Sequence, residues 1–297
     1  MSGLAVSAEP WATRWRGIRR LRVLRTVQVT PGMRRITLGG REIAGLSGGP
    51  NVKLLLPPAP RIGLELPLQD AAGKPVWPAE DRRPVLRSYT VRRLDATAGE
   101  LDIDFVLHGH AGIASAWAAR AKAGDEVGIA GLGGRGVNPA ARYILAGDHC
   151  ALPALVNILE GLPETARGHA FIEVPGPEEQ QKLRHPPGLA VTWLHHGPHG
   201  AGRTSLLARA VAGLAVAPGE DVFAWVAAES AAATAMGEHL RGVCGLDRRD
   251  MLVLGYWNFG VSVDDYGRSA AAQGRDQGRD QGRGEGPARA AQMQVAA

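Results

Sequence analysis

The stretch RYILAGDHCALPALVNILEGL, residues 142–162, contains a short apolar run, a Gly147-Asp148 turn and a longer apolar segment with helical spacing. This order predicts a buried strand followed by a helix. Three more strand–helix pairs follow along the chain, and MLVLGYW (251–257) ends the series. Repeated pairs are typical of a parallel sheet with helices on both faces, so we expect an α/β domain over residues 139–260. The expected helices cover 150–162, 177–183, 204–214 and 230–245.

The residues before this domain show a different pattern. From 17 to 138 the chain carries short runs in which apolar and polar residues alternate, interrupted by glycine and proline, as in 18–30 and 101–108. Alternation of period two predicts strands, and many short strands predict an antiparallel β barrel or sandwich. One helical stretch, 113–121, interrupts the strands, and the glycine-rich segment 131–140 marks the expected boundary between the domains.

The two ends of the chain differ from the rest in composition. Residues 1–20 are arginine-rich and lack the apolar stretch of a secretion signal, so we expect a cytoplasmic protein with a flexible N-terminus over residues 1–16. Residues 261–297 contain few apolar side chains and repeat RDQG, which predicts a disordered tail. An isolated interaction motif within the tail is the alternative.

Composition argues against several classes of protein. The chain has 297 residues, 45% of them hydrophobic, and a net charge of +5. No window approaches the ~20 apolar residues of a membrane span, so no membrane insertion is expected. The arginines of 14–35 alternate with apolar residues, which favours a solvated strand face over a nucleic-acid-binding surface. Cys150 and Cys244 are too few for a disulfide framework and lack metal-ligand spacing, so small buried thiols are expected.

The segment RSYTVRR (87–93) is the first candidate for a binding site. On a strand, side chains two residues apart share a face, so Arg87 and Tyr89 are expected side by side, with Thr90 on the other face unless the strand bends. A guanidinium binds phosphate bidentately and a phenol ring stacks on a flat heterocycle. Together they suit a flavin nucleotide. The alternative is an exposed strand with ordinary surface residues.

The segment LDIDFVLHGHAGIASAW (101–117) is the second candidate for a binding site. Alternation places Phe105 on a core face and Asp104, Val106 and His108 on the other. A glycine-containing turn then leads to a helix with Ser115 in its first turn, where free N–H groups and the positive helix end favour phosphate. The segment therefore indicates a pyrophosphate site, with a plain helix cap as the alternative.

The second half offers weaker candidates at the ends of its strands, where ligands of parallel sheets bind. The Gly147-Asp148 turn is one, although the GxGxxG fingerprint is absent; Glu229, before a helix, is another. Each is equally compatible with an ordinary loop or helix cap. The histidines His195, His196 and His199 lack a supporting carboxylate or cysteine, so a solvated loop is favoured over a metal site.

Several motifs resemble those of one family when taken in order. RSYTVRR, LDIDFVLHG, IASAWAARAKAGDEV, LAGDHCALPAL, VTWL and GYW are similar to segments of the siderophore-interacting proteins. These are flavoproteins of the ferredoxin-reductase-like group that reduce ferric siderophores. The resemblance covers roughly residues 17–260. It implies a Greek-key-like FAD-binding barrel followed by an NAD(P)H-binding-like α/β domain.

The resemblance also implies roles for individual residues. Arg87 would hold an FAD phosphate, Tyr89 would stack on the isoalloxazine, and the catalytic pair would be Thr90 and Glu229. The remaining implied cofactor contacts are Ser88, Asp104, Val106, His108, Gly112, Ala114, Ser115, Gly147, Asp148, Ala151 and Trp257. Lys53 in NVKLLLP and Arg135 in the glycine-rich segment are candidate substrate contacts, with plain surface charge as the alternative.

The sequence departs from the family pattern at a few positions. His149 and Cys150 stand where relatives carry an acidic residue and a threonine, Ala228 replaces a glycine, and Asn258 replaces an arginine. These departures lie in the second domain, where an electron donor would bind. They leave NADH, NADPH and a ferredoxin open as donors.

The expected function is a redox reaction at bound FAD. Electrons would pass from NAD(P)H through FAD to a ferric siderophore, which would release Fe(II), and no protein side chain would ligate the iron. Three alternatives remain: a ferredoxin-driven reductase, a general flavin or ferric reductase, and a non-enzymatic siderophore-binding module.

Overall fold

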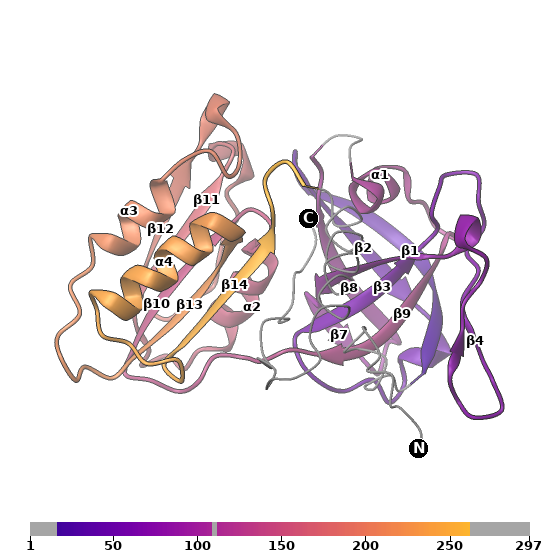
Figure 1. Cartoon of the computed structure of the whole chain (residues 1–297), viewed down its shortest axis with the longest axis horizontal. Coiled ribbons are helices and arrows are strands. Elements are labelled where there is room, and N and C mark those ends of the chain that lie inside the picture. Colours follow the sequence, from indigo (N-terminus) through magenta and orange to yellow (C-terminus); the bar gives the residue numbers. More distant parts are fainter. Residues whose placement is uncertain (1–16, 109–111, 262–297) are drawn as a thin grey trace, which may run out of the picture.

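The computed structural model describes residues 17–108 and 112–261, and two sheets form its framework (Figure 1). The N-terminus predicted to be flexible, 1–16, lies outside the described residues, as does all but the first residue of the tail predicted over 261–297. An antiparallel sheet domain comes first along the chain, and a parallel α/β domain follows it. The sequence-based fold prediction is therefore confirmed.

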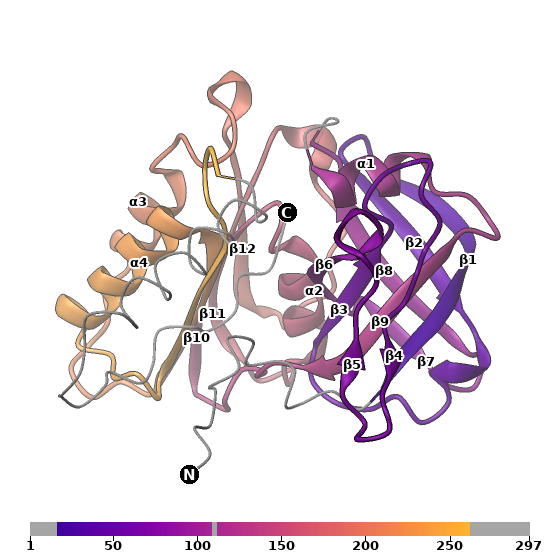
Figure 2. The ribbon, with the colours of Figure 1, turned by 45° about the vertical axis from the view of Figure 1, so that its right-hand side comes forward.

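The antiparallel sheet has seven strands in the order β6-β3-β9-β1-β2-β8-β7 and curves into a barrel around one apolar core (Figure 2). Its two ends approach each other where the Arg92 N–H, just after β6, donates to the Asp102 carbonyl on β8 at 2.9 Å. Helix α1 packs on the core through Trp117. The strands and α1 have these bounds: β1 Ile18–Thr30, β2 Met33–Gly39, β3 Asn51–Leu56, β6 Val85–Thr90, β7 Arg93–Asp95, β8 Glu100–Val106, α1 Ile113–Arg120 and β9 Glu126–Gly133.

The second sheet is fully parallel, with the order β12-β11-β10-β13-β14. Helix α2 covers one face, and α3 and α4 cover the other, which is visible in Figure 1. This arrangement puts the carboxyl ends of all five strands at one edge. The elements run β10 Arg142–Asp148, α2 Leu152–Gly161, β11 Arg167–Val174, β12 Gly188–His195, α3 Leu206–Ala212, β13 Val222–Glu229, α4 Ser230–Gly242 and β14 Met251–Trp257.

Two parts of the chain differ from the sequence-based expectation. The helix expected over 177–183 is only the 3₁₀ turn η4 (Pro177–Glu179), because the Glu179 carboxylate turns inward to accept a hydrogen bond from the Gly32 N–H of the barrel at 2.5 Å. Between β3 and β6 the chain forms a small hairpin, β4 (Leu68–Gln69) and β5 (Pro75–Val76), that no alternation pattern signalled. Two further 3₁₀ turns are η3 (Glu80–Arg82) and η5 (Gly197–His199), and η2 (Arg41–Ile43) follows β2.

The two domains share an apolar contact. Met33, at the start of β2, is fully buried in the core that α2 forms with the parallel sheet, and Val29 and Val106 of the barrel pack against the same core. Figure 2 shows α2 between the parallel sheet and the barrel. Helix α2 therefore serves both domains. Across the described residues, no helix is both long enough and apolar enough to cross a lipid bilayer.

Candidate active site

Strand β6 carries the first group of site residues at its carboxyl end. Arg87, Ser88, Tyr89 and Thr90 are all buried. Pairing with β3 puts Lys53 opposite Ser88, and the Lys53 ammonium donates to the Ser88 hydroxyl. Burial lowers the pKa of Lys53 below its usual value. Lys53 is half-buried, so it is not a fully exposed surface charge, and its contact with a substrate stays a prediction.

The Tyr89 ring packs on the barrel core. Its centroid lies 4.4 Å from that of Phe105, which in turn lies 5.7 Å from the ring of Trp117 on α1. Burial raises the pKa of the Tyr89 phenol, so this group stays protonated. This aromatic row joins β6, β8 and α1, the three elements predicted to hold a flavin nucleotide. Stacking of Tyr89 on a flavin stays a prediction.

The predicted ligand-facing side of β8 carries an ion pair. The Arg35 guanidinium on β2 donates to both carboxylate oxygens of Asp104, at 2.6 and 2.7 Å. Both carboxylate oxygens of Asp104 are thus bound by Arg35 within the barrel wall. The alternation pattern of the strand could not identify Arg35 as this partner. Val106 is half-buried and His108 is exposed.

The start of α1 fits a phosphate group. Within the described residues, Gly112 provides no side-chain cap and the first turn has no acidic residue, so no carboxylate of the helix itself competes with a bound anion there. Ala114 and Ser115 are buried, and the Ser115 hydroxyl accepts a hydrogen bond from the His108 N–H at 3.1 Å. A Cβ on Gly112 would lie 2.8 Å from the ring of the exposed His108, which would then have to turn aside. Residues 109–111 of the predicted turn lie outside the described residues.

The carboxyl edge of the parallel sheet centres on Asp148, at the end of β10. Its Oδ2 accepts from the Trp257 Nε1–H at 2.7 Å and from the Glu229 N–H at 2.9 Å. Its Oδ1 accepts from the N–H groups of Cys150 and Ala151 at 3.0 and 3.3 Å. Burial raises the pKa of Asp148 to about 6, although the four donors oppose this shift. The predicted cofactor contact at Asp148 is thus occupied by groups of the protein itself.

Gly147 and Ala151 have packing roles. Ala151 is fully buried in the α2 core, and a Cβ on Gly147 would lie 2.7 Å from the Ala151 Cβ. The absent side chain of Gly147 and the small methyl group of Ala151 allow the first turn of α2 to approach β10 closely. Any cofactor contact by these two residues is restricted to their backbone, because Gly147 has no side chain and the Ala151 methyl group is buried in the core.

Glu229 and Trp257 complete this edge. The Glu229 carboxylate caps α4 by accepting from the Ala231 and Ala232 N–H groups, and its second oxygen accepts from the Phe259 N–H at 3.2 Å. A Cβ on Gly202 would lie 2.7 Å from the Trp257 ring and 3.1 Å from the Glu229 side chain. The loop after β12 therefore lies directly on Trp257 and Glu229.

The end of β6 lies close to the end of β14. Thr90, the last residue of β6, is near enough to Tyr256 of β14 to lower the pKa of its phenol, although burial raises that pKa overall. Cys150 lies near enough to Tyr89 and Asp148 to affect their ionisation, and burial raises the pKa of its thiol. The GYW motif did not indicate that Tyr256 would lie near Thr90, because no local sequence pattern shows which strand of another domain a tyrosine will approach.

The remaining candidates lie around this junction or away from it. Asn51 on β3 pairs with Thr90 on one side and with Gly133, the last residue of β9, on the other. The exposed Arg135 follows Gly133 by two residues, so it comes shortly after the strand end that lies in register with Thr90. Cys150 and Cys244 are free and only partly buried, so the predicted burial of both thiols is only partly met. Within the described ranges, no cluster of His, Cys, Asp and Glu has the arrangement of a metal site.

Comparison with known proteins assigns the chain to a family. A model described as "Siderophore-interacting FAD-binding domain" matches residues 22–136, and one described as "Siderophore-interacting protein" matches residues 140–260. Ferric vibriobactin reductase ViuB of Vibrio cholerae is 34% identical over 84% of this chain and 92% of its own length. The chain belongs to the siderophore-interacting protein family. The predicted resemblance is confirmed.

Other members of this family have similar sequences or solved structures. The NADPH-dependent ferric-chelate reductase of Escherichia coli is 34% identical over 71% of this chain and 82% of its own length. The siderophore-interacting protein SipS of Aeromonas hydrophila superposes with a TM-score of 0.73 at 32% identity, covering 87% of this chain and 98% of that one. A siderophore utilization protein from T. fusca gives 0.71 at 36% identity, covering 83% and 94%.

Proposed function

We propose that this siderophore-interacting protein is an FAD-dependent ferric-siderophore reductase that takes electrons from NADPH or NADH and releases iron as Fe(II). The observation that carries the proposal is the proximity of two buried residues, Thr90 at the end of β6 and Tyr256 at the end of β14, which places the end of β6 close to the carboxyl edge of the parallel sheet. Strand ends of such sheets are where dinucleotides bind. A cofactor on β6 would therefore face a donor on the sheet.

The residues present fit FAD on the barrel side. Arg87 and the uncapped start of α1 supply positive charge and N–H donors for a diphosphate, and Tyr89 supplies a flat ring. Thr90 would lie at the reactive edge, near Tyr256. When bound, FAD supplies the chemistry that divides the two electrons of a hydride donor into single-electron steps.

The parallel-sheet side would receive the nicotinamide donor. Glu229 and Trp257 lie at its edge, and both donate hydrogen bonds to Asp148. These bonds fix the positions of the two residues that a bound ligand would contact. Both NADPH and NADH remain candidate donors. An Escherichia coli relative is named for its dependence on NADPH. In this chain, however, three histidines at the end of β12 and in the loop after it stand where relatives often carry an arginine.

The substrate side needs cations rather than iron ligands. Lys53 and Arg135 would attract the anionic groups of a ferric siderophore toward the β6 end. The hard oxygen donors of a siderophore bind Fe(II) more weakly than Fe(III), so reduction releases the metal. Each nicotinamide that is oxidised gives two electrons and releases one proton. The two electrons reduce two ferric complexes.

Anaerobic mixing tests the proposal. The purified protein is combined with FAD, NADPH or NADH, and a ferric siderophore, in the presence of a ferrous-iron chelator that forms a coloured complex. We expect two ferrous complexes per nicotinamide consumed, at a rate proportional to protein concentration. Equal rates with and without protein would refute the proposal, and binding of the ferric siderophore without flavin reduction by any donor would indicate a non-catalytic module.

A ferredoxin is the second candidate donor. The observation that favours it is the contact of Gly202 with Trp257 and Glu229, because side chains of the protein itself fill this part of the carboxyl edge. A ferredoxin transfers single electrons and needs no nicotinamide pocket. Flavin that is reduced by photoreduced ferredoxin but by neither NADPH nor NADH would decide for this donor.

A further inference from the structure

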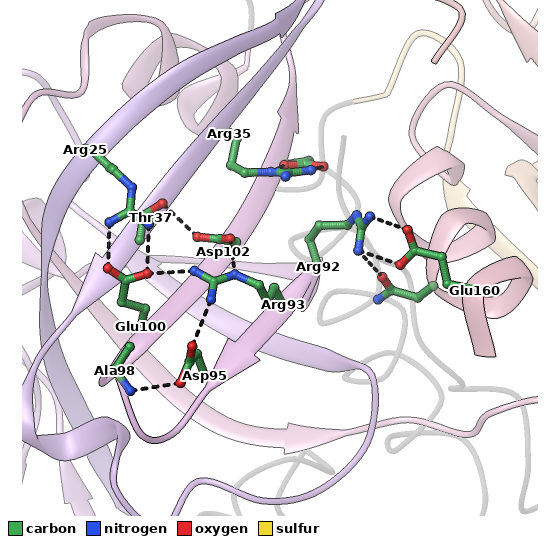
Figure 3. Close-up of polar contacts among 12 residues, drawn as sticks. Arg25, Arg35, Thr37, Arg92, Arg93, Asp95, Ala98, Glu100, Asp102 and Glu160 are labelled. Atoms are coloured by element: carbon green, nitrogen blue, oxygen red, sulfur yellow. Dashed lines mark hydrogen bonds and ion pairs between the residues drawn. The ribbon is translucent and has the colours of Figure 1, made fainter. Parts of the chain in front are cut away.

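Two consecutive arginines after β6 have different partners. Among the described residues, Arg93 binds barrel carboxylates, with its guanidinium donating to Asp102, Asp95 and Glu100 at 2.7, 3.2 and 2.6 Å. Arg92 turns the other way and reaches helix α2 of the second domain. Figure 3 shows Arg93 among the barrel carboxylates and Arg92 directed at Glu160.

The Arg92 contact is a two-pronged ion pair. Its Nη2 and Nη1 donate to Glu160 Oε1 and Oε2 at 2.8 and 3.0 Å, and Nη1 also donates to Asn157 Oδ1 at 3.2 Å. The Arg92 side chain is 18% exposed and that of Glu160 is 29% exposed. A bidentate pair with this degree of burial fixes orientation as well as distance.

Asn157 adds a second bond from the same helix. Its Nδ2 donates to the Val91 carbonyl at 2.7 Å. The backbone on either side is held by the barrel, since the Val91 N–H donates to the Pro50 carbonyl at 2.7 Å and the Arg92 N–H to the Asp102 carbonyl. Residues 91–92 are therefore fixed to the barrel by their backbone and to α2 by side-chain contacts.

The elements joined here are the two that carry the site. Val91 and Arg92 directly follow Thr90, at the end of the strand that would hold FAD, and α2 begins just after Asp148, which fixes Trp257 and Glu229. The distance between a donor on the sheet and a cofactor on β6 depends on how these elements lie relative to each other. A displacement of about 1 Å in such a geometry can cost as much as a hundredfold in rate.

We propose that Arg92, through Glu160 and Asn157, is a positioning residue for electron transfer from the nicotinamide to the flavin. This inference rests on the proposed function and adds a residue with no contact to the reacting atoms. The contact helps to fix the spacing between the domains next to Thr90, so it acts on the reductive half-reaction. The candidate substrate contacts, Lys53 on β3 and Arg135 after β9, lie on the barrel side, so we expect reoxidation by a ferric siderophore to depend much less on this spacing.

The test compares half-reactions in Arg92→Gln, Glu160→Gln, the double variant and the matched control Arg93→Gln. Bound flavin is reduced anaerobically with NADPH or NADH and followed by stopped flow. In separate runs it is reduced with dithionite and then mixed with ferric siderophore. FAD content and melting temperature are measured for each protein, so that loss of folding is detected directly.

We expect flavin reduction by the nicotinamide to fall about tenfold in Arg92→Gln and in Glu160→Gln, with no further fall in the double variant, since both act through one contact. Reoxidation should stay within about twofold of wild type. Arg93→Gln should leave both half-reactions near wild type, because its partners belong to the barrel.

Three outcomes would overturn the inference: an unchanged reduction rate in both single variants, an equal fall in both half-reactions, or the same selective fall in Arg93→Gln. Each can occur while wild-type protein still reduces ferric siderophore, so the proposed function would stand. A wild-type flavin that neither nicotinamide reduces would instead refute the proposed donor and this inference with it.

Discussion

The two walls of the candidate site differ in charge and in how their polar groups are used. The barrel wall gathers cations and N–H donors: Arg87, Lys53 and the uncapped start of α1. The sheet wall gathers carboxylates, Asp148 and Glu229, and each accepts hydrogen bonds from several N–H groups of its own domain. The barrel wall therefore suits an anionic diphosphate, whereas the sheet wall is an internally satisfied framework that positions residues.

The strongest test of the barrel wall is Arg87→Ala. If Arg87 holds a cofactor phosphate, its removal should weaken FAD binding by roughly ten- to a hundredfold, the range for hydrogen bonds to charged groups. The ratio of flavin to protein after gel filtration and a titration with FAD measure the change. Arg83→Ala, whose guanidinium lies over the Trp77 ring outside the site, is the control. Equal FAD affinity in both variants would remove Arg87 from the cofactor site.

A smaller effect is expected from Asp148→Ala in the sheet wall. The substitution leaves four N–H donors without their acceptor, two of them joining the ends of β13 and β14. We expect the free energy of unfolding to fall by about 2–3 kcal/mol, measured by denaturant titration. FAD affinity should change much less than in Arg87→Ala.

Asp247→Ala is the control for this experiment. Asp247 is highly exposed, and we expect its removal to change stability by less than about 0.5 kcal/mol. If Asp148→Ala were as stable as this control, the hydrogen bonds at Asp148 would contribute nothing to the folding of the sheet wall. If it lost FAD as strongly as Arg87→Ala, the contrast between the walls would be wrong.

The smallest effect concerns pH and His149, next to Asp148. Burial lowers the pKa of His149, with Glu179 opposing the shift and His196 adding to it. As pH falls below about 6.5 the unfolded chain gains a proton that native His149 resists, so stability is lost. His149→Gln should reduce the loss of unfolding free energy between about pH 7.5 and about pH 5.5.

The exposed His199 supplies the control for the pH experiment. His199→Gln should leave the pH dependence of unfolding close to that of wild type. The measurement is a set of denaturant titrations across the pH range for the three proteins. Parallel curves for wild type and His149→Gln would show that burial does not affect this imidazole.

Local sequence patterns were sufficient to predict most of the fold. The alternation of 18–30 predicted β1 with its bounds, and the apolar spacing of 150–162 predicted α2, because each element buries a face that its own residues define. The helix expected over 177–183 failed because Glu179 bonds to Thr30 and Gly32, almost 150 residues away. No local pattern contains that partner.

The candidate site was predictable to a similar degree. The residues of RSYTVRR and of the start of α1 were identified because their types match a flavin nucleotide, and the structure places them in adjoining elements of the barrel. What could not be predicted is which groups the protein satisfies internally. Asp104 binds Arg35 and Asp148 binds Trp257, and both pairings depend on strand order rather than on spacing.

The burial of Met33 beneath α2 has a consequence for how this chain could be divided or recombined. A methionine from the first domain fills part of the hydrophobic interior of the second, so neither half has a complete interior by itself. Expression of residues 139–260 alone would leave a hole where this side chain inserts, and the separated barrel would expose it to water. Hybrids made by joining one half to the other half of a distant relative should fold well only when the donor brings a side chain of matching volume at this position.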